Sequence, residues 1–590
     1  AHFIGASPAS TNLALLLGNV SRELVRHFEL TEDARTKRPI EVPTDPAKIL
    51  NLWPRILEAA GAKGQVVVVL DAVNQLDRSA DPLGAYWLPH KLPTGVRIIT
   101  SLLEHGEASQ PDHELDEGST ADWLATLRRR ELPEIPVPPL TDDGRRRIIR
   151  ELPSVFCKTL ADDQVAQLLE NEATRNPLFL TVALEELRIF GSFEQISRAI
   201  TQLPHLDDSQ IGGDVENAVE ALFGRVLDRL DRETRRQTPD LVPTLFRMLA
   251  SAREGLSEQE IDDVLARQLP GLAEGDRKSG MQVVLRQVRG YLMRKTAARG
   301  TLIDFYHRSF WKAVRATYMP DEASSRQSHH DLADYFAQQP SHLQQSDPAD
   351  PKSTLRTPHE RKVVELPWQR LAAEDWDGLE AVLTDLPFLE AKVEAGMTFE
   401  LASDYSTAVA ALPADRAHRE NLHLLGKAIR RDGLFLGRRP QTLFQCLWNT
   451  CWWYDCPQAE VHYEPYENPP WRRAGPKLFE LLQRWRQQKE QAEPGFVWLR
   501  SARPPRGPLD SPLLLTLTGH TRWVTSVSFS PDGRRIVSCS LPMDDLVRVW
   551  DAESGQELLP LKANSVEAVS FSLDGRRIAG RTSNSIIIWD

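Results

Sequence analysis

The sequence lacks the residue patterns of several common kinds of site. Its 590 residues contain no G-x-x-x-x-G-K-[ST] phosphate loop and no H-E-x-x-H, G-x-S-x-G or G-x-G-x-x-G pattern. A separate zinc protease, serine hydrolase or dehydrogenase site therefore has no support. Cysteine is scarce, and none of the five cysteines forms a C-x-x-C pair. This usage fits a reducing cytosol better than a disulfide framework, and we expect a cytoplasmic protein.

Long apolar runs and excess positive charge are also missing. No run approaches the roughly 18 apolar residues that span a bilayer, so we expect no membrane partner. The net charge of -12 argues against a dedicated nucleic-acid binder, which is usually basic. The chain opens "AHFIGASPAS" with neither an initiator Met nor a signal-peptide pattern, so we interpret Ala1 as a cut end. The Arg-, Ala- and Leu-rich composition suggests a bacterial source.

What is present begins with alternating strand and helix signals. In "VVVVLDAVNQLD", residues 66–77, five apolar residues run directly into Asp71, and "GVRIITS" forms a second strand signal further on. Strand and helix in this order predict a parallel sheet with both faces covered. Asp71 then lies at the carboxyl end of a strand, where open α/β sheets bind ligands. The alternative is a buried strand that merely ends in an acid.

The middle of the chain has helical periodicity. In "VENAVEALFGRVLDRL", one apolar stripe contains Val215, Val219, Leu222, Val226 and Leu230, which predicts a packed amphipathic helix. A polar run, "QQPSHLQQSDPADPKSTLRTP", separates this block from a second helical block that starts near His359. "SARPPRGPLDSP" has the composition of a linker.

The last part has the two-residue period of strands. "WVTSVSFSPDGRRIVSCS" and "SVEAVSFSLDGRRIAGRTS" share an S-x-D-G turn, and each continues to a Trp-Asp pair. Trp550 and Trp589 are roughly forty residues apart, which is the period of a WD-repeat propeller blade. Because a propeller needs roughly four to eight blades, we expect further blades beyond Asp590. A hydrogen-bond network that holds the first blade together is expected from His520, Ser538 or Ser540, Asp544 or Asp545, and Trp550.

Four segments together resemble one protein family: "HFIGASPASTNLALLL", "VVVVLDAVNQLD", "RNPLFLTVALEELRIFG" and "FYHRSFWKAVRATYM". They are similar to the NACHT-type branch of STAND NTPases, with the closest likeness to the telomerase-associated and nephrocystin-like group, which is often fused to WD repeats. The resemblance implies an ATP/ADP pocket, with Mg²⁺, between an α/β unit, a small helical domain and a winged helix.

The resemblance also implies roles for particular residues. Asp71 matches the acid that binds Mg²⁺ through the nucleotide, and Thr100 and Ser101 end the neighbouring strand that probes the γ-phosphate. Asn176 and Pro177 match the turn whose proline packs on the base. His307 matches the winged-helix histidine that contacts the β-phosphate. Two alternatives stay open: Pro177 as a helix-start proline, and His307 as a core histidine near Phe305 and Phe310.

Three departures from the family pattern bear on activity. The phosphate loop, which in the family precedes the "HFIG" strand, is expected upstream of Ala1. Asn74 and Gln75 replace two acids, and amides cannot take a proton from water; Asp77 is acidic but misplaced for that pattern. Leu102 replaces an arginine that often follows Thr-Ser. We expect nucleotide binding with at most slow ATP hydrolysis in the intact protein, and no hydrolysis by this chain, so no residue is assigned as catalytic.

"FQCLWNTCWWYDCP" contains three cysteines five residues apart, Cys446, Cys451 and Cys456, with His462 following. A five-residue step scatters side chains around a helix, whereas zinc needs four convergent ligands. Metal binding is therefore the weaker interpretation. We expect the tryptophans of this segment to pack a helical arm on its neighbours.

The predicted fold is multidomain: an incomplete P-loop-NTPase-like α/β sheet, then an all-α and winged-helix region, then incomplete all-β WD-repeat blades. The expected domains are an α/β NTPase core (1–140), a small helical domain (141–210), a winged-helix-like and helical domain (211–340), a helical arm (341–500), a linker (501–512) and about two WD repeats (513–590).

The function that these patterns favour is a nucleotide-regulated signalling switch. Its propeller would contact other proteins or sense a ligand, and the resemblance implies homo-oligomers in the active state. The alternative is a non-enzymatic scaffold with a degenerate NTPase core, which Asn74, Gln75 and Leu102 favour.

Overall fold

The computed structural model divides the chain into two compact units. One contains Ala1–Val20 with Gly61–Ser328, and the other contains Ser21–Ala60 with His329–Asp590. The structure describes residues 13–32, 40, 42, 46–71, 73, 87–89, 91–102, 124, 127–128, 130, 132–155, 159–190, 192–205, 215–297, 300–346, 354–463, 468–505, 509, 517–531, 533–541, 546–552, 555, 557–562, 565–572, 575 and 577–589. The "HFIG" segment, Asn74, Gln75, Asp77, Asp544 and Asp545 lie outside these residues.

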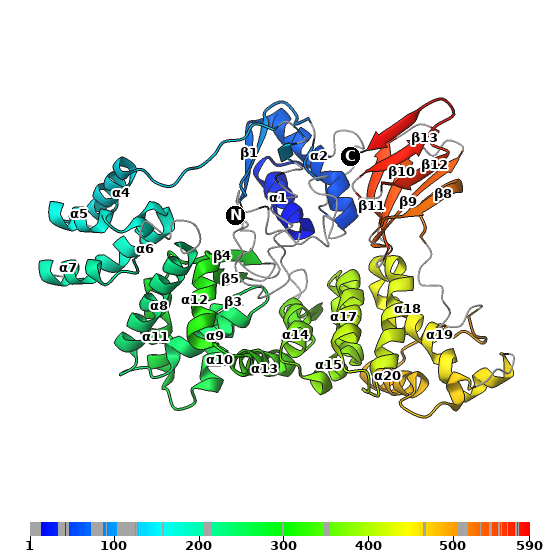
Figure 1. Cartoon of the computed structure of the whole chain (residues 1–590). Coiled ribbons are helices and arrows are strands. Elements are labelled where there is room, and N and C mark those ends of the chain that lie inside the picture. Colours follow the sequence, from blue (N-terminus) through cyan, green and yellow to red (C-terminus); the bar gives the residue numbers. More distant parts are fainter. Residues whose placement is uncertain are drawn as a thin grey trace. The chain divides into compact units, whose positions relative to one another are not determined.

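Two parallel strands form one sheet of the first unit (Figure 1). β1 (Val66–Leu70) pairs with β2 (Val96–Thr100) in register from Val66 opposite Val96 to Leu70 opposite Thr100. The prediction of two covered faces is wrong on one face. Alternate residues of β1 are buried, but Val67 and Val69 are 58% and 63% exposed, so no other part of the described chain covers that face.

Two helices lie at the division between the units, α1 (Leu13–His27) and α2 (Pro46–Lys63). Gly61 lies inside the last turn of α2. A Cβ at Gly61 would approach the carbonyl oxygen of Thr94 to 2.8 Å. This glycine therefore lets the end of α2 approach the start of β2 closely, and the helix continues past it.

The helical region that follows is built from short, well-capped helices. Ser192 accepts a hydrogen bond from the backbone N–H of Gln195, whose side chain returns to the Ser192 N–H as a capping box. The elements are α4 (Asp142–Val155), α5 (Asp162–Leu169), the 3₁₀ turn η3 (Glu172–Arg175), α6 (Pro177–Leu187) and α7 (Phe193–Thr201).

The next described elements are five helices and three strands, in the part of the chain for which the resemblance implies a winged helix. They are α8 (Val215–Thr234), α9 (Leu241–Ser251), β3 (Leu256–Ser257), α10 (Glu258–Gln268), α11 (Glu274–Gln287), β4 (Leu292–Ala297), β5 (Gly300–Phe305) and α12 (Arg308–Tyr318). The three strands form an antiparallel sheet in the order β3-β5-β4. The predicted stripe of α8 is buried at Val219, Leu222, Val226 and Leu230.

Aromatic packing fixes α12 against this domain. The Phe310 ring lies 4.9 Å from that of Phe223, 5.6 Å from that of Phe246 and 5.5 Å from that of Phe305, between ring centroids. All four side chains are fully buried. The residue that precedes α12, His307, is positioned by this cluster because the chain passes directly from β5 into the helix.

The second unit is mostly helical before its strands begin. Its elements follow α13 (Glu322–Gln338), which crosses the division: β6 (His342–Ser346), β7 (Thr354–Pro358), α14 (Glu360–Ala372), α15 (Trp376–Leu383), α16 (Leu386–Glu394), α17 (Thr398–Ala411), α18 (Arg419–Arg438), the 3₁₀ turn η5 (Pro440–Thr442), α19 (Leu443–Asp455), the turns η6 (Pro457–Val461) and η7 (Pro470–Arg472), and α20 (Leu478–Ala492). The polar run before His359 is therefore not a plain loop, because it contains the antiparallel hairpin β6–β7. Among the helices of the described residues, none has the length and apolar character needed to cross a lipid bilayer.

The C-terminal strands form two antiparallel sheets, as the two-residue period predicts. The first has the order β11-β10-β9-β8, from β8 (Trp523–Phe529), β9 (Arg535–Leu541), β10 (Leu546–Asp551) and β11 (Glu557–Lys562). The second contains β12 (Ala568–Phe571), β13 (Ile578–Arg581) and β14 (Ile586–Trp589). Valines of both sheets share one buried cluster, and the Ser526 hydroxyl accepts a hydrogen bond from the Val569 N–H at 3.1 Å.

Candidate functional site

The carboxyl ends of β1 and β2 bring two candidate residues into contact. The backbone pairing continues past the strands, with the Ser101 N–H donating to the Leu70 carbonyl at 3.0 Å and the Val73 N–H donating to the Ser101 carbonyl at 3.0 Å. The Ser101 hydroxyl donates a hydrogen bond to the Asp71 carboxylate. Both residues are exposed, and Thr100 is half-buried beside them. An acid and a hydroxyl thus meet at the edge where open α/β sheets bind ligands.

His307 lies within electrostatic range of this edge. Burial lowers the pKa of His307 to about 4, and the Asp71 carboxylate acts in the opposite direction. The imidazole is therefore neutral near pH 7, with one ring nitrogen as donor and the other as acceptor. His307 occupies the cap position of α12, but its side chain makes no capping hydrogen bond in the described residues. The Ser101 hydroxyl therefore contacts Asp71, and His307 lies within electrostatic range of the Asp71 carboxylate.

Asn176 and Pro177 have a local structural role. The Asn176 side-chain oxygen accepts hydrogen bonds from the N–H groups of Leu178 at 2.8 Å and Phe179 at 3.1 Å, and Pro177 occupies the first turn of α6. This is the geometry of a helix-start proline behind an asparagine cap. The described contacts of Asn176 are with α6 and the preceding turn, while the Pro177 ring is exposed to solvent.

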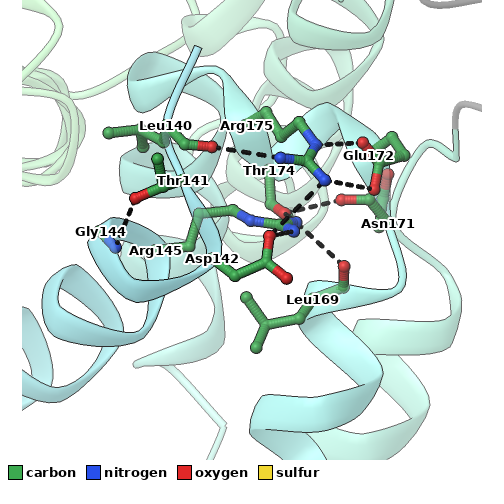
Figure 2. Close-up of polar contacts among 10 residues, drawn as sticks. All are labelled: Leu140, Thr141, Asp142, Gly144, Arg145, Leu169, Asn171, Glu172, Thr174 and Arg175. Atoms are coloured by element: carbon green, nitrogen blue, oxygen red, sulfur yellow. Dashed lines mark hydrogen bonds and ion pairs between the residues drawn. The ribbon is translucent and has the colours of Figure 1, made fainter.

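A buried arginine that the sequence analysis missed positions this turn (Figure 2). Arg145 of α4 is 1% exposed. Its guanidinium donates to the Leu169 carbonyl at 2.9 Å, to the Thr174 hydroxyl at 2.7 Å and to the Asp142 carboxylate at 2.7 Å. These bonds tie α4 to the end of α5 and to η3, which leads into α6.

The charge of Arg145 also acts on its neighbour, because the hydrogen bond from Arg145 holds the pKa of Asp142 below its ordinary value. In the sequence, Arg145 stands in "DDGRRR", which resembles a solvated charge run. One signal pointed to burial: Ile149 follows four residues later and is buried on the same helix.

In the first C-terminal sheet, His520, Ser538 and Trp550 form one hydrogen-bonded chain. The Trp550 indole N–H donates to the Ser538 hydroxyl at 2.7 Å, and a His520 ring nitrogen lies 2.7 Å from the same oxygen. The other ring nitrogen lies 2.9 Å from the Ser540 hydroxyl, so both serines take part. Asp545 lies outside the described residues. Trp589 packs on the cluster shared by the two sheets.

The cysteine-containing helix α19 packs through its tryptophans. The Trp448 and Trp452 rings are stacked with centroids 5.7 Å apart, and the Arg500 guanidinium lies 4.7 Å from the Trp452 ring. Burial raises the pKa of the Cys456 thiol to about 11. Among the described residues, no group of three or more His, Cys, Asp or Glu side chains could hold a metal ion.

Comparison with known proteins gives one family match and several distant relatives. The family "WD domain, G-beta repeat" matches residues 511–551. A TPR repeat-containing protein of Dictyostelium discoideum is 22% identical over 415 residues, which cover 65% of this chain and 22% of that protein. The human NACHT and WD repeat domain-containing protein 2 is 24% identical over 347 residues, which cover 57% of this chain and 18% of that protein.

Telomerase protein component 1 of Mus musculus is 22% identical over 569 residues, or 90% of this chain and 19% of that protein. The chain thus spans about a fifth of the length of the relatives that it matches. It is a multidomain chain that carries a WD repeat and is similar to NACHT and WD repeat proteins.

Proposed function

We propose that this chain contains the nucleotide-responsive part of a STAND-class signalling switch whose WD repeats contact other proteins. The observation that carries the proposal is the hydrogen bond of Ser101 to Asp71 within electrostatic range of His307. These residues come from two parallel strands and from the winged-helix region, which are far apart in the sequence. The similarity to a NACHT and WD repeat protein supports the same interpretation.

The donor set at this edge fits a magnesium nucleotide. Mg²⁺ in nucleotide sites is held by one or two carboxylates together with phosphate oxygens and water. Asp71 supplies an exposed carboxylate, of which one oxygen accepts from Ser101. Thr100 and Ser101 are hydroxyl donors for a terminal phosphate. When bound, Mg²⁺ would neutralise charge on the phosphates.

His307 is suited to report which nucleotide is bound. A neutral imidazole donates one N–H to a phosphate oxygen without the cost of burying a charge. In this proposal His307 contacts the β-phosphate and Pro177 packs on the base. In this proposal ADP and ATP stabilise different conformations, because each nucleotide favours the conformation that it binds better. Loss of the contact between His307 and the β-phosphate then lets the winged-helix region move. Homo-oligomers in the triphosphate state belong to the same proposal.

The decisive test begins with the coding sequence immediately upstream of Ala1. A G-x-x-x-x-G-K-[ST] loop there supports the switch, and its absence would overturn nucleotide binding, because this loop supplies the main phosphate contacts. With the loop present, ADP and ATP binding is measured by calorimetry for wild type, Asp71→Asn, His307→Ala and the control Asp240→Asn. We expect Asp71→Asn to weaken Mg²⁺-dependent binding and His307→Ala to weaken ADP more than ATP.

A second candidate function is a scaffold that binds no nucleotide. The observation in its favour is the pair of WD-type sheets with exposed apolar side chains on β8, where Trp523 is 84% and Phe529 is 62% exposed. The rate of ATP hydrolysis separates the two candidate functions. If wild type and Asp71→Ala hydrolyse ATP equally slowly, the protein does not act as an ATPase. Unchanged ADP affinity in both Asp71→Asn and His307→Ala would leave the scaffold as the better function.

A further inference from the structure

Residues 132–139, "LPEIPVPP", form an extended segment that leads into α4 (Figure 1). All eight residues are exposed, and none is in a helix or strand. Four of them are prolines, which fix φ near −65° and remove backbone donors, so the segment favours a polyproline II conformation. Two apolar side chains are almost fully exposed, Ile135 at 83% and Val137 at 90%.

The segment is held at both ends. At its carboxyl end, the Leu140 N–H donates to the Arg175 carbonyl at 3.0 Å, and the Arg175 side chain lies beside Leu140 (Figure 2). At its amino end, Arg130 donates to the Leu88 carbonyl at 2.8 Å, and Arg128 pairs with Glu134 at 2.8 Å. The Leu140 and Glu134 contacts, which do not involve Arg130, limit the conformational entropy that the segment loses when it binds a partner.

Three residues per turn place every third residue of a polyproline II helix on one edge. Pro133, Pro136 and Pro139 therefore share an edge, and Arg130 precedes Pro133 by three residues in the sequence. Leu132 and Ile135 each precede a proline of that edge. The segment thus presents two pairs of an apolar residue and a proline, Leu132-Pro133 and Ile135-Pro136. The positively charged Arg130 precedes both pairs in the sequence.

We propose that residues 132–139, together with Arg130, are a docking segment for a protein domain of the SH3 type, whose aromatic-lined groove binds polyproline II peptides. Leu132-Pro133 and Ile135-Pro136 fill the two apolar pockets. Arg130 exchanges the Leu88 carbonyl for an acidic side chain beside the groove. A rigid spacer needs only the prolines, whereas this segment also exposes apolar side chains that a spacer does not require.

The test uses the whole chain against a panel of purified SH3 domains, with binding measured by biolayer interferometry. Ile135→Asp places a charge in an apolar pocket. Val137→Asp is the matched control, because Val137 is equally exposed but lies on the third edge, with Glu134. Neither change touches the core, so thermal unfolding should be the same for both variants and wild type.

We expect at least one domain to bind, with a dissociation constant that rises about tenfold or more for Ile135→Asp, which corresponds to about 1.4 kcal/mol, and stays unchanged for Val137→Asp. The double variant Pro133→Ala/Pro136→Ala should also lose binding, while Pro138→Ala keeps it. Equal binding by Ile135→Asp and wild type would overturn the proposal, as would a panel in which no domain binds the chain.

Discussion

The Ser101 hydroxyl donates a hydrogen bond to the Asp71 carboxylate across the parallel pair β1–β2. The register that places Leu70 opposite Thr100 makes the two following residues neighbours. The contact therefore follows from strand pairing, although thirty residues separate the two side chains. The same carboxylate acts on the charge of His307, which relates the sheet edge to the start of α12.

The His307 imidazole should titrate near pH 4. Burial lowers its pKa, while Asp71 raises it, so Asp71→Asn should lower the pKa further. Histidine NMR measures both titrations, and the signal missing in His307→Gln assigns the resonance. An unchanged His307 pKa in Asp71→Asn would show that the two residues are not close.

The same group makes stability depend on pH. The pKa of His307 is about 4 in the folded chain and near 6.5 when unfolded, so the unfolded chain binds the proton more readily. The contribution of this group is complete above about pH 6.5 and is lost as the pH falls toward 4. Wild type should therefore lose more stability across this range than His307→Gln, as measured by denaturant unfolding at a series of pH values.

Replacing Gly255 should destabilise the packing of α9 and β3 against β5. Gly255 has a φ of 84°, and a Cβ there would lie 2.3 Å from the Ile303 carbonyl oxygen. We expect Gly255→Ala to cost about 2–4 kcal/mol of unfolding free energy. Gly290→Ala is the control, because no atom lies within 4 Å of a Cβ at that position. Equal melting temperatures for the two variants would contradict this prediction.

Arg145→Met should destabilise the helical region that contains α4. The change leaves the Leu169 carbonyl, the Thr174 hydroxyl and the Asp142 carboxylate without a donor that they have in the wild type. A loss of about 3 kcal/mol is expected for removal of one partner of a buried charged network. The exposed neighbour Arg146→Met should change stability by less than about 0.5 kcal/mol. Calorimetric unfolding of both variants measures the difference.

Trp550→Phe should weaken the first C-terminal sheet by about 1–2 kcal/mol, because the ring is retained but the indole donor to Ser538 is lost. Ser538→Ala should cost more, since Ser538 also contacts His520. The two losses should be less than additive in the double variant. Trp523→Phe, at a side chain 84% exposed, is the control. Full additivity would show that the two residues are not coupled.

Much of the local structure could be predicted because it depends on residues close in the sequence. The strand before Asp71 is a short continuous apolar run, and the buried stripe of α8 and the antiparallel C-terminal strands repeat a 3.6-residue and a two-residue period. The proximity of Ser101 to Asp71 could be expected because two neighbouring parallel strands end at the same edge of a sheet. The expected contact of Asn176 and Pro177 with the base of a nucleotide stays a prediction, because the described contacts of these residues are with neighbouring residues in the sequence.

The features that the sequence alone left undetermined depend on residues far apart. Arg145 is polar and becomes buried only because Leu169 and Thr174 supply acceptors for it. A glycine is required at position 61 because Thr94 approaches α2 there, and the exposure of one face of β1 depends on what packs against it. Local periodicity therefore determined the amphipathic helix α8 and the antiparallel C-terminal strands. Only tertiary packing decided which polar groups are buried, which glycines are required and how far the pKa of His307 moves, because each depends on the desolvation and close contacts that distant segments create.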